Sequence, residues 1–330
     1  MTKWSRLNYS ELQLREEQLI ELSGMEVITK QVLISNFCYL YVQYCGDSTK
    51  PKLILLHGYC GASMIFYKIL KQLSERFYII MIDLLGMGRS SRPSFGYSKL
   101  SQCENFFTTC LEEFREKENI SRFTIAGHSF GGYVASCYTI LYPQYVERLI
   151  LLSPIGVNEP PPDWNYFHSL KEKDWKFRWV MKIITFFWVK NITPVTIMRK
   201  LGPISKSFMK VYSHKKFQTL GNDKEIMESY LEQINLLPGS GELALIYILN
   251  PGGVAIKPLW RRLSELNIPI LFFYGDRDWI KSSGAEQTAS LNKNVISKII
   301  DDSGHDLYWD NPNQLIDKIF ESIDESSTTE

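Results

Sequence analysis

Hydrophobic residues form short, continuous runs along this 330-residue chain, and the runs are separated by segments with helical spacing. The apolar runs lie at residues 53–56, 78–82, 123–126, 149–152, 270–274 and 295–300. The helix-like segments lie at residues 65–73, 103–117 and 132–141, with a final one at about 311–323. Runs of this length, alternating with helices, are typical of strands buried on both faces of a mostly parallel sheet.

The residues ahead of these runs follow a different pattern. Residues 5–24 carry leucines at helical spacing among charged residues, namely Leu12, Leu19 and Leu22. This spacing predicts an amphipathic helix packed on the core. Residues 26–34 and 38–44 are strand-like, and the second run alternates toward a turn at Gly46. We expect these two runs to form an antiparallel edge of the sheet.

The alternation of strands and helices stops after Ser153-Pro154. Residues 157–262 read as helical, are rich in tryptophan and phenylalanine, and are interrupted by prolines. We interpret this segment as a helical cap inserted into an α/β core. The core would then comprise residues 1–156 and 263–330.

Composition and charge exclude several classes of protein. The 37 Lys and Arg residues nearly balance the 36 Asp and Glu residues, so the basic excess of a nucleic-acid-binding protein is absent. The six cysteines have no metal-ligand spacing, and we expect neither a metal nor a cofactor. No secretory signal or membrane-length apolar stretch is visible in the sequence. These features favour a cytoplasmic protein, soluble or peripheral on a membrane.

The residues with the clearest chemistry are Gly127-His128-Ser129-Phe130-Gly131, a G-x-S-x-G pattern. They stand directly after a predicted strand and before a predicted helix, which is the setting that a nucleophile elbow requires. We therefore predict that Ser129 is a nucleophile. The backbone amide of Phe130 then becomes one donor of an oxyanion hole.

A second loop follows the apolar run at 53–56 and reads His57-Gly58-Tyr59-Cys60-Gly61. Such folds place their oxyanion-hole loop at this position, and we assign the amide of Tyr59 as the second donor. Because the loop backbone would perform this role, the side chain of His57 is expected to be structural.

A serine nucleophile needs a base and an acid, which in this fold follow it in the chain. Of the five histidines, His305 stands in Ser303-Gly304-His305-Asp306 after the last predicted strand. Residues 274–279, YGDRDW, provide two acidic candidates, Asp276 and Asp278. The G-x-x-D spacing favours Asp278 as the acid, and Asp276 is expected to cap the turn.

Together these motifs resemble one subfamily of α/β-hydrolases. It includes N-acyl-phospholipid lysophospholipase, the adipose-lipase co-activator, cardiolipin-specific phospholipase and lysophosphatidic acid acyltransferases. The matching segments are HGYCGASMIFYK at 57–68, DLLGMGRSSRP at 83–93, GHSFGG at 127–132, YGDRDW at 274–279 and SGHDLYWDNP at 303–312. The resemblance spans almost the whole chain, although the cap sequence is its own.

The resemblance implies hydrolysis of acyl esters in phospholipids or lysophospholipids through an acyl-enzyme on Ser129. One alternative is acyl transfer to lysophosphatidic acid, which the resemblance associates with an H-x4-D spacing, here His305 and Asp310. Another is a non-catalytic lipase co-activator, a branch that has lost the serine. The presence of Ser129 favours an active enzyme.

Asp310 also has a simpler interpretation. With one nitrogen of His305 facing Ser129 and the other bonded to Asp278, the imidazole has no nitrogen left for a second carboxylate. Asp310 precedes Asn311-Pro312 and the final helix, so we expect it to cap that helix.

The cap contains a segment in which aromatic and aliphatic residues are mixed with basic ones. The apolar members are Trp175, Phe177, Trp179, Ile183, Ile184, Phe186, Phe187 and Trp188, and the basic ones are Arg178, Lys182 and Lys190. This composition suits contact with a bilayer interface, such as a lipid droplet, a mitochondrion or the endoplasmic reticulum. The same aromatics could instead pack the cap on the core, and the sequence leaves both interpretations open.

Overall fold

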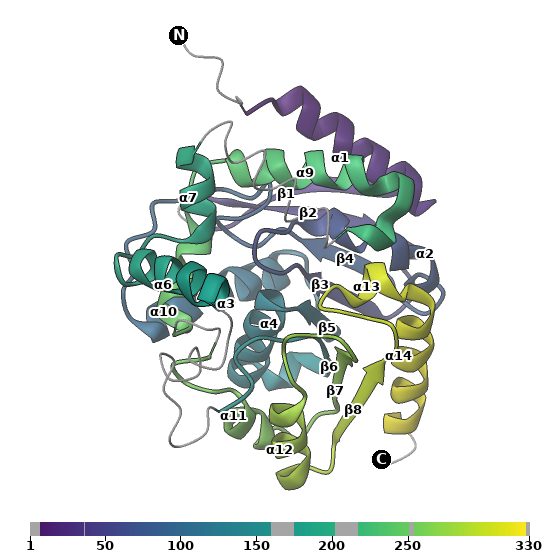
Figure 1. Cartoon of the computed structure of the whole chain (residues 1–330). Helices are drawn as coiled ribbons and strands as arrows, with labels where there is room; N and C mark the ends of the chain where they lie inside the picture. The colour runs from purple at the N-terminus through teal and green to yellow at the C-terminus, as the bar shows by residue number, and fades with distance from the viewer. Residues whose placement is uncertain (1–6, 36, 160–174, 202–216, 251–253, 328–330) are drawn as a thin grey trace.

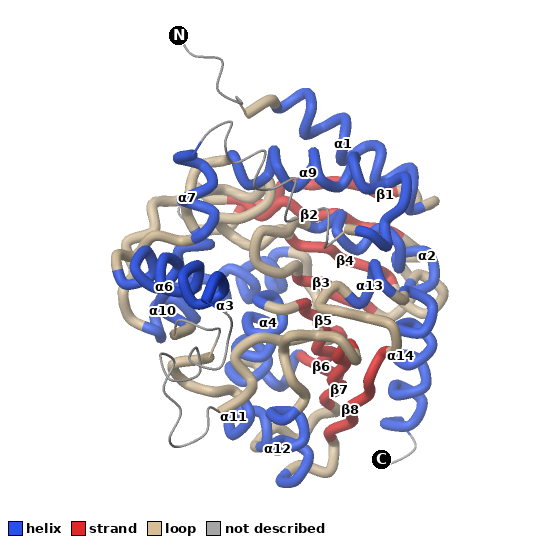
Figure 2. Tube along the Cα trace, viewed as in Figure 1, coloured by secondary structure: helices blue, strands red, loops and turns tan. Residues whose placement is uncertain are grey.

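The computed structural model describes residues 7–35, 37–159, 175–201, 217–250 and 254–327, and they contain one eight-stranded sheet (Figures 1 and 2). The strands are β1 Val27–Leu33, β2 Tyr39–Cys45, β3 Lys52–Leu56, β4 Tyr78–Ile82, β5 Phe123–His128, β6 Val146–Leu152, β7 Ile270–Gly275 and β8 Val295–Ile300. Their order across the sheet is β1-β2-β4-β3-β5-β6-β7-β8. β2 pairs antiparallel with both β1 and β4, and all the other pairs are parallel. The predicted fold class is confirmed.

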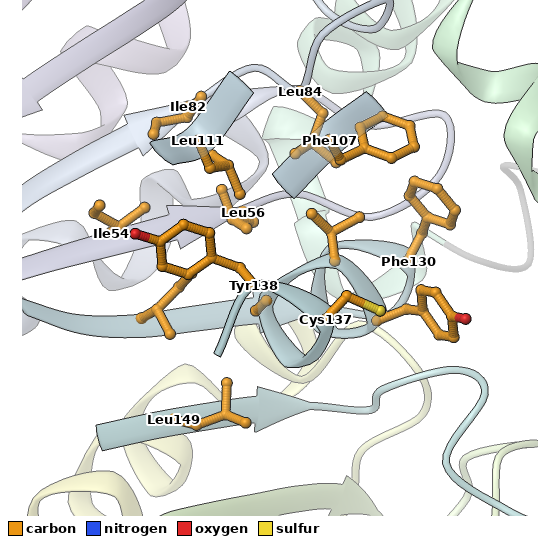
Figure 3. Packing of buried hydrophobic residues seen from close by; sticks show 14 of the residues in the cluster. Ile54, Leu56, Ile82, Leu84, Phe107, Leu111, Phe130, Cys137, Tyr138 and Leu149 are labelled. Carbon is orange, nitrogen blue, oxygen red and sulfur yellow. The ribbon is translucent and has the colours of Figure 1, made fainter. Parts of the chain in front are cut away.

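Helices cover both faces of this sheet because alternate strand residues point to opposite faces. In β3, Ile54 and Leu56 join one apolar cluster, which is completed by α3 Leu100–Lys117 and α4 Phe130–Leu141. Figure 3 shows this packing, with Leu111 and Tyr138 directed at the strands and Phe107 directed at Phe130. On the opposite face Leu53 and Leu55 join a second cluster. Its helical members include η1 Ser63–Ile69, α2 Leu70–Leu73, α13 Leu307–Asp310 and α14 Pro312–Ser327.

The first helix, α1 Tyr9–Ser23, lies beside α9 Lys224–Leu236 although the two are far apart in sequence (Figure 1). Leu12 and Leu19 are buried as predicted, whereas Leu22 is 44% exposed and does not belong to the packed face. Asn8 caps the helix by accepting hydrogen bonds from the amides of Ser10 and Glu11. The packing face is therefore narrower than the leucine spacing predicts.

A buried ion pair fixes α1 to the core. The Glu16 carboxylate accepts hydrogen bonds from Arg89 and from the hydroxyl of Tyr41. Burial raises the pKa of Glu16 more than Arg89 and Tyr41 lower it. An uncompensated charge at this depth would be costly, so the two donors are required for the helix to dock.

The described elements between β6 and β7 are helices joined by loops, apart from an isolated bridge between Leu249 and Ala255. Besides α9, its elements are α6 Trp175–Val189, α7 Pro194–Leu201, η3 Gln218–Asp223, η4 Gly241–Ala244, α10 Leu245–Ile248 and α11 Trp260–Ser264. We propose that residues 157–262 form a cap inserted between the two parts of the core, residues 1–156 and 263–330. Parts of this segment, residues 160–174, 202–216 and 251–253, lie outside the described residues.

Within the described ranges, the helices are all too short or too polar to cross a membrane.

Candidate active site

The predicted site residues follow four strands whose carboxyl ends lie at one edge of the sheet. Gly58 and Tyr59 follow β3, Ser129 follows β5, Asp278 follows β7 and His305 follows β8. β3 and β5 are direct neighbours, and β6 alone separates β5 from β7. Parallel strands thus bring residues from distant parts of the chain to one location.

Ser129 occupies a sharp turn between β5 and α4, with φ 53° and ψ −112°. A positive φ is uncommon for a residue with a side chain, and at functional sites such strain is held by the surrounding structure. Here the Ser129 amide donates to the carbonyl of Leu152 at 2.9 Å, and the Ser129 carbonyl accepts from Ile155 at 3.2 Å. The turn has the geometry of a nucleophile elbow.

The glycines on either side of the turn are required by close backbone approach. A Cβ atom added at Gly127 would overlap the backbone of Gly131. One added at Gly131 would overlap the carbonyls of Leu56 and His57, which end β3. Both positions therefore admit only a hydrogen atom, which explains why the pattern places glycine two residues before and two residues after the serine.

The loop after β3 lies directly against the elbow. A Cβ atom added at Gly58 would lie 3.2 Å from the Cβ of Ser129. Phe130 is the first residue of α4, so its amide has no partner within the helix. The amides of Tyr59 and Phe130 thus belong to two segments that meet beside Ser129.

His57 is buried and neutral. Its Nε2 accepts a hydrogen bond from the Leu84 amide at 3.0 Å, which leaves Nδ1 to donate to the Gly58 carbonyl at 2.8 Å. Burial lowers the pKa of His57, in agreement with this uncharged form. The side chain joins the loop after β3 to the loop after β4, as expected for a structural residue.

Asp278, and not Asp276, lies beside the imidazole of His305. The Nδ1 of His305 donates to the two carboxylate oxygens of Asp278 at 3.1 and 3.4 Å. Burial alone would raise the pKa of Asp278, but the hydrogen bond and charge of His305 outweigh it and hold that pKa below its usual value. Asp278 is therefore an ionised, buried partner of His305.

Asp276 lies at the neighbouring turn and is partly exposed. Its carboxylate accepts a hydrogen bond from the Ser303 amide at 2.9 Å, and this bond is the main reason that its pKa is lowered. The amide of Arg277 donates to the Ser303 carbonyl at 2.9 Å. Both contacts hold the loop that leads to His305, so the predicted role in the turn has a geometric basis.

No hydrogen bond joins the hydroxyl of Ser129 to His305 within the described part of the chain. Such bonds are often long in enzymes without substrate and tighten when substrate binds. The two residues are instead connected through His128, whose ring lies 4.8 Å from the ring of His305.

His128 belongs to the site, although no role was assigned to it from the sequence. Its Nε2 donates to the backbone carbonyl of His305 at 3.0 Å. Its Nδ1 lies 3.3 Å from the hydroxyl of Tyr308, which also donates to Asp306 at 3.1 Å. Because His128 directly precedes Ser129, it ties the backbone of the His305 loop to the elbow. His128 occupies the first variable position of the G-x-S-x-G pattern, and that pattern does not predict which residue stands there.

The structure contradicts the expected role of Asp310 as the cap of the final helix. Asp310 ends the short helix α13, and α14 starts at Pro312 after Asn311. The side chain of Asn311 accepts a hydrogen bond from the Gln314 amide at 3.3 Å and takes the capping position. The carboxylate of Asp310 instead accepts from the Gly304 amide and the Thr219 hydroxyl, both at 2.8 Å. The extra turn of α13 shifts the capping position by one residue.

Helix α6 presents an apolar face to solvent. The exposed fractions of Trp175, Trp179 and Phe186 are 68%, 63% and 55%. With Lys182 and Ile183, Trp179 and Phe186 line an open depression of about 440 Å³. Trp188 has the opposite orientation, since it packs on the core cluster and its Nε1 donates to the Leu249 carbonyl at 3.3 Å. The side chains of Phe177, Arg178 and Ile184 lie outside the described set.

The sheet, the elbow and the acid–histidine pair together define an α/β-hydrolase. Residues 51–180 match the sequence model of the alpha/beta hydrolase fold. A solved membrane phospholipase A, described as a bacterial virulence factor, shares this fold with a TM-score of 0.66 and 20% identity, over 96% of this chain and 92% of that one.

Comparison with characterised sequences is more specific. A probable 1-acylglycerol-3-phosphate O-acyltransferase of Oryza sativa subsp. japonica is 32% identical over 291 residues, covering 84% of this chain and 68% of that protein. A (lyso)-N-acylphosphatidylethanolamine lipase of Bos taurus is 27% identical, covering 96% and 93%. The chain belongs to the α/β-hydrolase family, in the subfamily that contains these acyltransferases and lipases.

Proposed function

We propose that the protein is a serine hydrolase that cleaves acyl esters of phospholipids or lysophospholipids. The observation that carries this proposal is the strained elbow at Ser129, at the same edge of the sheet as the hydrogen-bonded pair Asp278 and His305. A serine in this conformation projects from the backbone toward a substrate instead of filling the core. The relatives named for lipid esters and acyl acceptors indicate the class of substrate.

The reaction begins when the Oγ of Ser129 attacks the ester carbonyl and the Nε2 of His305 accepts its proton. The imidazolium is stabilised by Asp278, and the tetrahedral oxyanion accepts hydrogen bonds from the amides of Tyr59 and Phe130. Collapse breaks the bond to the alcohol, which takes the proton from His305 and leaves an acyl group on Ser129. Water then attacks the acyl-enzyme by the same steps and releases the fatty acid.

Acyl transfer is the second candidate, because the relative from Oryza sativa is named as an acyltransferase. Its chemistry differs only in the second half, where the hydroxyl of lysophosphatidic acid attacks the acyl-enzyme in place of water. His305 would accept the proton of either nucleophile. A non-catalytic co-activator is disfavoured, since Ser129 and its supporting glycines are all present.

We further propose that the exposed face of α6 contacts a lipid surface. Trp175, Trp179 and Phe186 offer aromatic rings that partition into a bilayer interface. Lys182 and Lys190 add positive charge beside them, and the Lys190 ammonium lies 4.6 Å from the ring centre of Phe186. Anionic lipid head groups would complement this charge.

The first experiment is labelling of the purified protein with a fluorophosphonate, which reacts only with an activated serine. We expect the wild type and Ser290→Ala, an exposed-serine control, to be labelled and to hydrolyse lysophospholipids. Ser129→Ala should lose both properties while keeping its thermal stability. Turnover by the Ser129→Ala protein would refute the proposed mechanism.

A second assay separates hydrolysis from transfer. Lysophosphatidic acid is added as the acceptor, and the fatty acid released is compared with the phosphatidic acid formed.

A further inference from the structure

The carboxylate of Asp310 connects the loop that carries His305 to the inserted helical segment. The Oδ2 of Asp310 accepts a hydrogen bond from the amide of Gly304, the residue directly before His305. Its Oδ1 accepts a hydrogen bond from the hydroxyl of Thr219 in η3. Both donor–acceptor distances are 2.8 Å, so each oxygen has one well-formed bond.

We propose that Asp310 is a positioning residue that holds the His305 loop in register with the segment from Phe217 to Asp223. The inference rests on the proposed role of His305 as the base. In this interpretation the H-x4-D spacing places a carboxylate that positions His305, and this positioning is needed for hydrolysis and acyl transfer equally. In this role the carboxylate never touches the substrate.

The geometry of the His305 loop shows why a separate restraint on Gly304 matters. Asp276 holds the amide of Ser303, and His128 holds the carbonyl of His305. Between these two anchors, the Gly304 amide is held by Asp310. A Cβ added at Gly275 would overlap the carbonyls of Ser303 and Gly304, so the loop also lies tightly against the end of β7. Loss of the Asp310 bond frees the residue next to the base.

The segment on the other side of Asp310 is itself firmly docked. The ring of Phe217 packs edge-on against Trp309 at 5.1 Å, and both side chains are buried. The Nε1 of Trp309 donates to the carbonyl of Ile65, and the hydroxyl of Tyr67 donates to Asp223, both at 2.8 Å. Asp310 is thus attached to a surface that η1 and α13 fix in place.

The matched variants are Asp310→Ala, Asp310→Asn and Thr219→Val. The asparagine keeps both links, because its oxygen can accept from Gly304 and its amide can donate to the Thr219 hydroxyl. Valine has nearly the shape of threonine and removes only the link to η3. Asp317→Ala, an exposed aspartate on α14, is the control for loss of a surface charge.

Steady-state kinetics on a short soluble ester provide the first readout. We expect Asp310→Ala to lower kcat by about tenfold to a hundredfold with little change in KM, because a small misplacement of a catalytic group costs that much. Asp310→Asn should stay within a few-fold of the wild type. Thr219→Val should lower kcat by a few-fold, and in the double variant with Asp310→Ala it should add nothing further. The ratio of transfer to hydrolysis should not change in any of them.

Hydrogen exchange at Gly304 provides a readout that is independent of turnover. Its amide should exchange faster in Asp310→Ala than in the wild type and Asp310→Asn. This result would support the link even if Ser129→Ala showed that the proposed function is wrong. A folded Asp310→Ala protein with wild-type kcat and an unchanged Gly304 amide would overturn the inference. So would an Asp310→Asn enzyme that keeps hydrolysis and loses transfer. If Asp310→Ala does not fold, a folded Thr219→Val protein with wild-type kcat would overturn it instead.

Discussion

The loop around His305 and the outer face of α6 use their side chains in opposite ways. Around the loop, the carboxylates of Asp276, Asp278 and Asp310 each accept a hydrogen bond from a loop residue. His128 donates to the backbone carbonyl of His305. On α6, large apolar side chains lie in solvent next to lysines. Polar groups held in fixed positions suit catalysis, which needs a precise geometry. Exposed aromatic side chains suit binding to a lipid surface, which has no fixed structure.

The largest effect is expected when the negative charge of Asp278 beside His305 is removed. Asp278→Asn should lower kcat by about 10⁴-fold, since an amide fixes the wrong tautomer and cannot stabilise the imidazolium. Asp276→Asn should cost far less, because it leaves the acid–histidine pair intact. The measurement is kcat on a soluble ester together with fluorophosphonate labelling. A crippled Asp276→Asn enzyme beside an active Asp278→Asn enzyme would reverse the assignment of the acid.

Changing α6 should affect attachment and spare the chemistry. Replacing Trp175, Trp179 and Phe186 together by serine should weaken binding to vesicles of anionic phospholipid by at least a hundredfold, since burying even one aromatic side chain contributes about 1.5–3 kcal/mol and tenfold in affinity is about 1.4 kcal/mol. Hydrolysis of a soluble ester should not change.

The control for the α6 experiment is Trp188→Ser, whose indole packs inward and donates to Leu249. This variant should lose thermal stability instead of vesicle affinity. If the triple variant melts at a lower temperature and binds vesicles normally, the exposed face is a packing surface and not a lipid contact.

The smallest expected effect concerns acid stability. The pKa of Asp278 is held below the ordinary aspartate value of 3.8 by His305, so its ionised form stabilises the fold. That contribution is present above the unfolded pKa and is lost as the pH falls through the folded pKa. The difference in free energy of unfolding between the wild type and Asp278→Asn should therefore shrink below pH 3.8. Ser129→Ala is the control, and a difference that did not shrink as the pH fell below 3.8 would contradict the assignment.

Much of the fold could be predicted because its determinants are local. The buried strands are continuous apolar runs, and the elbow needs small residues at fixed positions around Ser129. The triad candidates followed from chain order, because parallel strands deliver their ends to one edge.

The remaining features depend on contacts between distant segments. Asp310 meets Thr219 across 91 residues, and no spacing within SGHDLYWDNP reveals that partner. Leu22 has the helical spacing of a buried residue, but it is 44% exposed in the folded chain. The orientation of Trp188 follows in the same way from its contact with Leu249. Patterns along the chain predict which segments form strands and helices. The contacts that each side chain makes depend on tertiary packing.

The contact between α1 and α9 has a consequence for the order in which the chain folds during synthesis. The Asn8 amide donates to the side chain of Gln233, a partner 225 residues further along the chain, and Ser229 donates to Glu11. During synthesis α1 therefore leaves the ribosome well before α9 and must wait for it before it can dock. Contacts of such long range slow folding and leave apolar surface unprotected in the meantime. The face of α1 that becomes buried is narrow, with Leu12 and Leu19 as its apolar members, so docking has little apolar surface on this helix to protect.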